Sequence, residues 1–331
     1  MKKKLFSTIL AAAMMIAALA GCGGGSTGGG SGNKADGNYK FGFTISTRDQ
    51  FLTSMEVAAT KEMEAQGYKL EVNDSDNDVT KQLAHIQTWA TQQYSAIIIN
   101  LVNADNAIEC VDAAAGVPCV FVNRLPDQNA LSDTVVYVGS DENDSGRMQA
   151  ELLMDDALKG KTEINAILFQ GTLGQTAATL RSASVKKGFE DLGVKVNWVY
   201  EDTAEWDRNK AMDKMTQLIS SGTKYDVIVS NNDEMALGCI EAYKAANKKI
   251  DVPIIGVDAT QVACQSIADG ELYASVYQSS VGQGGGAAKA AIQLAKGEKV
   301  EGADENHIVW VPFEKVNKDN VQDYLDMYAA K

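Results

Sequence analysis

Short apolar runs recur along the chain and end in polar residues at intervals of 23 to 30 residues. Between them lie stretches in which apolar residues follow a helical period, as Phe51, Met55, Ala58, Ala59 and Met63 do. Runs of this length bounded by polar residues predict buried strands, and the intervening period predicts amphipathic helices. The predicted strands cover residues 41–45, 70–72, 96–99, 118–122, 164–169, 194–199, 227–229 and 253–257.

Strands that alternate with helices predict an α/β fold with parallel sheets and helices on both faces. The runs fall into two sets, so we expect two lobes, which also suits a chain of 331 residues. The residues between the two sets hold one more apolar run, 135–138, and a helical pattern from about Asn143. A crossover between the lobes is expected there.

The first residues have the pattern of an export signal. Three lysines, Lys2 to Lys4, precede an unbroken apolar run from Ile9 to Ala20, which is too short to span a bilayer. The segment Leu19–Cys22 resembles the lipobox of bacterial lipoproteins, with cleavage before Cys22 and lipid attached there; the alternative is an ordinary signal peptide. We therefore expect a lipoprotein signal peptide at 1–21 and a flexible Gly-rich tether at 22–37.

Charge and composition exclude several classes of function. The chain has 44 acidic and 30 basic residues and a formal net charge of −14. The predicted signal peptide contains lysines but no acidic residue, so its removal makes the protein more negative. Such a chain does not suit nucleic acid, and it would contact an anionic membrane through its lipid alone. Two histidines leave little for imidazole catalysis or a histidine metal site. Of the cysteines after Cys22, we favour free buried thiols over disulfides.

The carboxyl ends of the predicted strands are polar, as at Asn100, Asn123, Gln170 and Asp258. Ligands of open parallel sheets bind beyond these ends. Amide, carboxylate and guanidinium groups can hydrogen-bond many hydroxyls but are poorly suited to proton transfer at neutral pH. The alternative is that these residues cap the following helices, as Asn231 followed by Glu234 suggests.

Seven segments of the chain form an ordered set: 73–78, 99–102, 117–124, 137–141, 204–207, 231–238 and 256–259. In this order and spacing they resemble the periplasmic monosaccharide-binding proteins, most closely the galactose/glucose-binding branch and then the ribose-binding branch. The resemblance implies two Rossmann-like lobes with parallel sheets joined by a three-strand hinge, the type I periplasmic binding protein fold. It implies one lobe at 38–139 plus 279–309 and the other at 140–278 plus 310–331.

The same resemblance implies a binding site between the lobes. Phe51 and Trp206 match the aromatic pair that sandwiches the sugar ring, and Gln175 lies in the matching loop. An ionised Asp258 is expected to accept hydrogen bonds from two hydroxyls. The positions that match hydroxyl-binding residues are Asp49, Asn123, Arg124, Arg181, Asn232, Asp258 and Gln278.

Two departures leave the identity of the sugar open. Gln175 and Ala177 stand where the galactose/glucose branch has His and Asp. The calcium loop of that branch is replaced by the short, basic segment 159–163, and the acidic segment 74–78 lacks the Gly and Glu of an EF-hand. We expect no metal and no cofactor.

The sequence thus predicts a monomeric sugar receptor that is not an enzyme, anchored by lipid at the outer face of the cytoplasmic membrane. Its partners would be the permease and ATPase of an ABC importer. A galactose- or glucose-like aldohexose is favoured; a ribose or other pentose or hexose binder, or a sensor subunit for a chemoreceptor or histidine kinase, is the alternative. A sugar-processing enzyme is the third hypothesis, although nucleophile-elbow, HExxH and Walker motifs are lacking.

Overall fold

The regular apolar runs form two parallel sheets in the computed structural model, which describes residues 39–330. The predicted signal peptide, Cys22 and most of the tether lie outside the described residues. The first sheet has the order β11-β5-β4-β3-β1-β2, and all its strands are parallel. Its strands are β1 (Phe41–Ile45), β2 (Leu70–Asp74), β3 (Ala96–Ile99), β4 (Cys119–Val122), β5 (Val135–Gly139) and β11 (Ile308–Trp310).

The second sheet has the order β7-β6-β8-β9 and is also parallel. Its strands are β6 (Glu163–Gln170), β7 (Lys195–Thr203), β8 (Val227–Ser230) and β9 (Ile254–Ile255). A separate antiparallel pair joins β10 (Ser275–Tyr277) to β12 (Glu314–Val316). The α/β fold class with parallel sheets expected from the sequence is confirmed.

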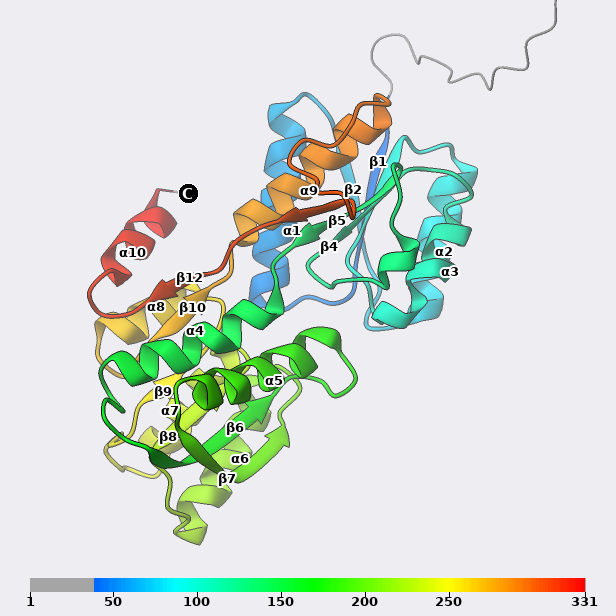
Figure 1. Ribbon diagram of the computed structural model, residues 1–331. Coiled ribbons are helices and arrows are strands. Elements are labelled where there is room, and N and C mark those ends of the chain that lie inside the picture. Colours follow the sequence, from blue (N-terminus) through cyan, green and yellow to red (C-terminus); the bar gives the residue numbers. More distant parts are fainter. Residues whose placement is uncertain (1–38, 331) are drawn as a thin grey trace, which may run out of the picture. The chain divides into compact units, whose positions relative to one another are not determined.

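Helices cover both faces of each sheet, as Figure 1 shows. On the first sheet, α1 (Gln50–Ala65) and α9 (Ser280–Ala295) pack side by side on one face, and α2 (Val79–Thr91) and α3 (Ala107–Ala113) cover the other. Gly284 is required at the first of these contacts, because a Cβ there would lie 2.2 Å from the backbone oxygen of Met55. Two short 3₁₀ helices, η1 (Ala104–Asn106) and η2 (Gln128–Ala130), complete this half.

On the second sheet, α4 (Glu142–Asp155) and α5 (Thr176–Asp191) cover one face. The other face carries α6 (Arg208–Ser221), α7 (Asp233–Ala245), α8 (Gln261–Ala268) and α10 (Val321–Ala329). We call the first sheet with α1, α2, α3 and α9 the N-lobe, and the second sheet with its helices and the β10–β12 pair the C-lobe. Both belong to one compact unit.

The chain passes between the lobes three times. It leaves the N-lobe between β5 and α4, returns between β10 and α9, and leaves again between β11 and β12. We propose the division into 38–139 plus 279–309 and 140–278 plus 310–331, which places two boundaries at passages and the third at the end of β11, just before the passage to β12. Three short connections between the lobes allow the lobes to rotate relative to each other while each core stays intact.

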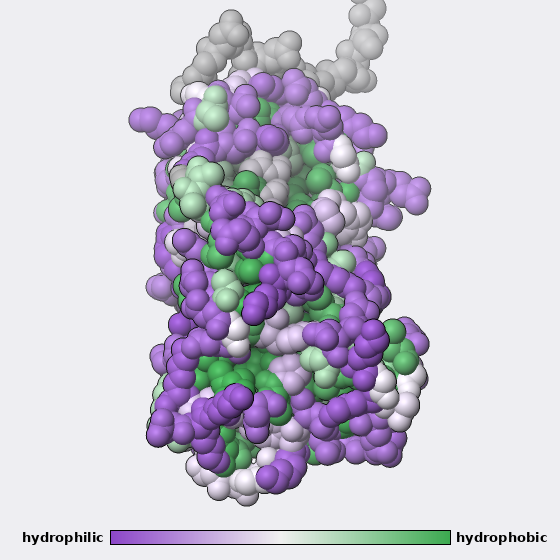
Figure 2. Space-filling view, turned by 90° about the vertical axis from the view of Figure 1, so that its left-hand side faces the viewer, coloured by the Kyte–Doolittle hydropathy of each residue, from purple (hydrophilic) through white to green (hydrophobic). Residues whose placement is uncertain are grey.

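Hydrophilic side chains dominate the face shown in Figure 2, with smaller hydrophobic areas between them. Within residues 39–330, no helix has the length and apolar content needed to cross a membrane. The four cysteines of this part, Cys110, Cys119, Cys239 and Cys264, are buried and free, as predicted. Burial raises the pKa of the Cys110, Cys119 and Cys264 thiols to about 12, so they are unreactive at neutral pH.

Candidate functional site

The carboxyl ends of both sheets face a cleft between the lobes. Its inner part, a cavity of about 50 Å³, is lined by twelve residues, and all ten side chains predicted from the sequence are among them. Residues from both lobes contribute, so one ligand there would touch both. The lining residues are Asp49, Phe51, Leu52, Asn123, Arg124, Gln175, Ala177, Arg181, Trp206, Asn232, Asp258 and Gln278.

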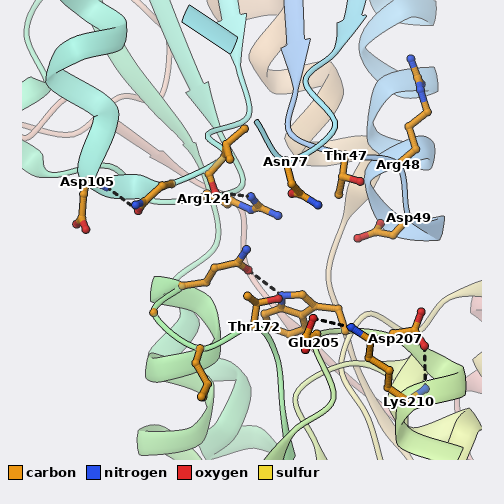
Figure 3. Close-up of a pocket in the computed structure, with 16 residues that line it drawn as sticks. Thr47, Arg48, Asp49, Asn77, Asp105, Arg124, Thr172, Glu205, Asp207 and Lys210 are labelled. Atoms are coloured by element: carbon orange, nitrogen blue, oxygen red, sulfur yellow. Dashed lines mark hydrogen bonds and ion pairs between the residues drawn. The ribbon is translucent and has the colours of Figure 1, made fainter. Parts of the chain in front are cut away.

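The inner cavity continues into an outer one of about 650 Å³, which shares Asp49, Arg124, Gln175 and Trp206 with it. Figure 3 shows this outer part, with Asn77 and Arg124 of the N-lobe on one side and residues such as Thr172 and Lys210 of the C-lobe on the other. The cleft therefore leads from solvent to the inner cavity.

Asp49 and Arg124 stand at the strand ends of the N-lobe. Asp49 caps α1 by accepting a hydrogen bond from the Leu52 amide at 2.7 Å. Arg124 donates to the carbonyl oxygens of Leu101 and Val102 at 2.7 and 3.1 Å. Burial raises the pKa of Asp49 and lowers that of Arg124 to about 10, and each charge partly offsets the burial of the other. The N-lobe contributes its charges as a mutually supporting pair.

Trp206 lies in a loop whose backbone is left-handed at Glu205 and Trp206, with φ of 55° and 65°. Its indole nitrogen donates to Gln175 Oε1 at 2.7 Å. The ring lies against the backbone of Gly171, where a Cβ would come within 2.0 Å of it, so only glycine fits there. The Arg181 guanidinium lies 5.6 Å from the ring centre, within cation–π distance. These contacts hold the ring in one orientation.

Arg181 is buried and forms a two-pronged ion pair with Glu142. Its Nε and Nη2 atoms lie 2.6 and 3.0 Å from the two carboxylate oxygens. Burial opposes the charge of Arg181, but the attraction and hydrogen bonds of Glu142, together with the charges of Asp258 and Asp233, outweigh it and raise the pKa of the guanidinium. Nη1 also lies 3.7 Å from Asp258 Oδ1. The pair fixes a permanent positive charge beside Asp258.

Asp258 is buried among charges of both signs. Burial raises the pKa of its carboxyl well above the usual range of an aspartate, and the nearby charge of Arg181 acts in the opposite direction. The negative charges of Asp233, Asp49 and Glu142 add to the rise. The ionised Asp258 expected in a closed, sugar-bound cleft stays a prediction.

The backbone at Asp258 is strained, with a φ of 117° that is rare for any residue but glycine. Three hydrogen bonds hold it. The amide of Asp258 donates to the Val276 oxygen at 2.7 Å, and the amides of Ala259 and Thr260 donate to Ser275 Oγ and Asp233 Oδ2. Ser275 Oγ in turn donates to Asp233 Oδ1 at 2.6 Å. Asp233, which was not among the predicted binding residues, therefore helps to fix the turn.

The capping alternative holds for part of the set. Asn232, not Asn231, caps α7 by accepting from the Met235 amide at 3.0 Å, so the expectation for Asn231 was wrong. Asn231 Oδ1 instead accepts from the Gly171 amide and Ser182 Oγ. Asp258 caps nothing, because α8 is capped by Thr260. Asp258 is therefore left available for a ligand.

The side-chain amide of Gln278 is only partly hydrogen-bonded. It is 2% exposed and lines the inner cavity. Its Oε1 accepts from Arg181 Nη2 at 3.2 Å, whereas its Nε2 has no hydrogen-bond partner among the described residues. A buried donor without an acceptor costs about 1–3 kcal/mol. A ligand oxygen beside Gln278 would remove that cost.

The cleft can therefore bind a flat, hydroxyl-rich molecule. Within residues 39–330, no group of three or more His, Cys, Asp or Glu side chains is arranged to hold a metal ion. Neither His85 nor His307 lines either cavity of the cleft. Glu142 is the main residue that sequence reasoning missed. Nothing in the helix pattern around it marks a buried carboxylate, and only its contact with Arg181 reveals its role.

Comparisons with known proteins agree with this geometry. A family model described as a periplasmic binding protein domain matches residues 41–299. A protein of Rhizobium meliloti, provisionally named a rhizopine-binding protein, is 38% identical over 263 residues, covering 78% of this chain and 82% of its own. The D-galactose/methyl-galactoside binding periplasmic protein of Haemophilus influenzae is 34% identical over 295 residues, covering 84% and 88%.

A solved structure is also similar. It is an ABC transporter solute binding protein from Bacillus halodurans with bound myo-inositol, and its TM-score against this chain is 0.81 at 33% identity. The match covers 88% of this chain and 99% of that one.

Proposed function

The chain belongs to the periplasmic binding protein domain family, and from this premise we propose that it is an extracytoplasmic receptor for a monosaccharide. It captures the sugar between its two lobes and delivers it to the permease and ATPase of an ABC importer. The observation that carries the proposal is Gln278, a buried amide in the inner cavity whose Nε2 has no partner. A hydroxyl-bearing ligand supplies the missing acceptor.

The lining residues suit a sugar in complementary ways. Phe51 of the N-lobe and Trp206 of the C-lobe offer aromatic faces for the apolar C–H faces of a pyranose. Asp49, Asn123 and Arg124 from one lobe, and Arg181, Asn232, Asp258 and Gln278 from the other, can bind its hydroxyls. Gln175 acts through Trp206, which it orients.

Closure of the lobes on the sugar is the proposed mechanism. A ligand that touches both lobes binds the closed arrangement better than the open one and shifts the population toward it. Moving from almost entirely open to almost entirely closed takes about 5.5 kcal/mol of differential binding. Stacking on Trp206 together with hydrogen bonds to Asp258 and Gln278 is sufficient in magnitude.

The ligand is expected to leave unchanged. The cleft has no histidine among its lining residues, and the relatives reported above are named as binding proteins. Mass spectrometry of the sugar released after prolonged incubation measures this directly. An altered mass would identify an enzyme instead.

For the ligand we favour a six-membered ring rich in hydroxyls, with galactose or glucose first. The relative that binds D-galactose and the solved structure with myo-inositol support this ring size. Gln175 and Ala177 lack the polar groups that the galactose/glucose branch has there, which keeps ribose and other pentoses or hexoses as alternatives. A sensor for a chemoreceptor or kinase would use the same site.

A thermal-shift screen with galactose, glucose, ribose and myo-inositol tests the function. A ligand present at a hundred times its Kd adds about 2.7 kcal/mol to the free energy of unfolding and raises Tm accordingly. Asp258→Ala serves as the matched variant and should lose most of the shift. No shift with any sugar or polyol would exclude the proposed function.

The site of action is proposed to be the outer face of the cytoplasmic membrane, where lipid on Cys22 anchors a monomer. Cys22→Ser should release the protein from membranes and leave its sugar affinity unchanged, because the Gly-rich segment separates anchor from cleft. Fractionation followed by calorimetry checks both parts. Complete retention of the variant in the membrane fraction would contradict the anchor.

A further inference from the structure

A row of buried hydrogen bonds crosses the carboxyl edge of the N-lobe sheet. At its start, the backbone N–H and the Oγ of Ser46 both donate to Asn100 Oδ1, at 3.2 and 2.6 Å. Asn100 Nδ2 donates to the carbonyl oxygen of Val122 at 3.2 Å and faces Asn123 Oδ1 at 3.5 Å. Ser46 and Asn100 are both 0% exposed.

The row continues to the passages between the lobes. Asn123 Nδ2 donates to Gln283 Oε1 at 3.1 Å, and Gln283 Nε2 donates to Ser140 Oγ at 3.0 Å. Gln283 and Ser140 are 0% and 1% exposed. We call Ser46, Asn100, Asn123, Gln283 and Ser140 the amide ladder. Its last two members do not line the inner or the outer cavity.

The direction of each amide in the ladder follows from backbone groups that cannot exchange roles. The Ser46 N–H can only donate and the Val122 carbonyl can only accept, so they fix which end of the Asn100 amide is oxygen. Asn100 then presents a donor to Asn123, which therefore turns its oxygen toward Asn100 and its nitrogen toward Gln283. Gln283 Oε1 accepts the hydrogen bond from Asn123 Nδ2 and so fixes the end of the Asn123 amide that points away from Asn100.

Gln283 stands where two passages between the lobes meet. It lies in the first turn of α9, directly after the chain has returned from β10. Ser140, its other partner, follows β5 in the passage that leads to α4. One buried side chain therefore connects Asn123 with both passages.

We propose that Gln283 is a positioning residue that sets the orientation of the Asn123 amide and couples it to the passages between the lobes. The proposal rests on the proposed function, because it takes Asn123 as a sugar contact. The ladder leaves Asn123 one N–H and one lone pair of defined direction for the ligand. A rotation of the lobes that moves Ser140 or the start of α9 changes the hydrogen bonds that hold the Asn123 amide. The affinity for the sugar therefore depends on the arrangement of the lobes.

Calorimetry on the full chain with galactose, glucose, ribose and myo-inositol tests the proposal. Gln283→Leu should weaken binding about fivefold, the effect of one hydrogen bond, although the residue does not line the cleft. Asn123→Ala should then cost less in the Gln283→Leu background than in the wild type. Trp206→Ala should cost the same in both backgrounds, because the ladder does not reach it.

Two further variants separate positioning from general damage. Gln149→Leu removes another fully buried glutamine, one that donates to the Ser230 and Gly256 oxygens in the C-lobe. It should lower Tm without changing the cost of Asn123→Ala. Ser140→Ala is the milder change within the ladder and should weaken binding in the same direction as Gln283→Leu, also less than additively with Asn123→Ala.

The outcomes are distinguishable. If the wild type binds sugar and the costs of Gln283→Leu and Asn123→Ala simply add, or Gln283→Leu binds as the wild type does, the positioning role is overturned and the proposed function stands. If the wild type binds none of the sugars or polyols, both fall together.

Discussion

The two halves of the cleft solve the same problem with different chemistry. The N-lobe holds Asn123 in a ladder of neutral amides and hydroxyls. The C-lobe holds Asp258 amid charges, with Arg181 and Glu142 on one side and Asp233 below the turn. Neutral hydrogen bonds fix direction at little cost in desolvation, whereas buried charges bind more strongly but only when they are paired.

This difference suggests a division of roles. The neutral ladder of the N-lobe orients the ligand and responds to the passages between the lobes, because it ends there. The charged Asp49 and Arg124 of the same lobe lie outside the ladder. The charged half, by which we mean the cluster of Asp258, Arg181, Glu142 and Asp233 in the C-lobe, supplies most of the binding energy and makes it dependent on pH. The strain at Asp258 belongs to the charged half, where Asp233 and Ser275 hold a backbone conformation that an isolated turn would avoid.

The largest effect is expected in the charged half. Asp258→Ala should reduce sugar binding by about 2–4 kcal/mol, because charge-assisted hydrogen bonds to two hydroxyls are lost and those hydroxyls stay unpaired. Asn123→Ala, its counterpart in the N-lobe, should cost about 1 kcal/mol. Calorimetry on both variants gives the ratio. A larger loss for Asn123→Ala would reverse the assignment of roles.

The aromatic pair comes next. Trp206→Ala should cost about 1–3 kcal/mol of sugar binding through lost stacking and ring burial. Gln175→Ala is the matched variant, since it removes only the partner of the indole nitrogen. Gln175→Ala should lose less binding free energy than Trp206→Ala. Calorimetry measures both variants, and Gln175→Ala, which keeps the indole, can also be followed by fluorescence titration. Equal losses would mean that the orientation of the ring matters more than its area.

The charged half predicts the pH dependence. Burial raises the pKa of Asp258 well above normal and that of Asp233 to about 7. Sugar hydroxyls favour the ionised form of Asp258, so binding should release protons and tighten as pH rises. The free energy of unfolding of the ligand-free protein should fall as pH rises. A carboxyl whose pKa is raised in the folded state stabilises that state at low pH, and this contribution is lost as pH rises from the ordinary aspartate value through the raised one.

Calorimetry in buffers of different ionisation enthalpy, at about pH 5 and about pH 8, measures this proton release. Thermal unfolding without sugar checks the second trend over the same range. Asp258→Asn should remove the proton release while keeping the shape of the side chain. Affinity that is independent of pH in the wild type would show that Asp258 is ionised throughout.

A smaller effect concerns selectivity. Gln175→His combined with Ala177→Asp adds two polar groups to the C-lobe side of the cavity, both at positions that line it. Galactose or glucose affinity should rise relative to ribose by about tenfold, the gain from one or two added hydrogen bonds. An unchanged ratio would mean that this loop does not set the preference.

The smallest effect is expected at the rim. Asp76 lies between β2 and α2 and forms a solvent-exposed ion pair with Lys81, which Asp76→Ala removes. Exposed ion pairs contribute little, so binding should change by less than about 0.5 kcal/mol. Calorimetry with the same sugar checks this. A loss as large as that of Asp258→Ala would move the site away from the inner cavity.

The sequence predicted much of the architecture because periodicity is local. Apolar runs and helical spacing were sufficient for strands such as β1 and β3, whose bounds agree with the predicted ranges. β9 is shorter than predicted, with two residues instead of five, because the chain leaves regular pairing before the strained turn at Asp258. Polar residues at strand ends pointed to the cleft, since parallel strands bring those ends to one edge.

Only the tertiary structure decided how the cleft residues are held. Asn123 meets Gln283 across 160 residues of chain, and Arg181 meets Glu142 across 39. No local pattern marks these partners, because an amide or carboxylate in a helix has the same sequence context whether it faces solvent or a buried neighbour. The direction of an amide and the pKa of a carboxyl depend on what the fold brings within hydrogen-bonding distance, and this is a property of the packed chain alone.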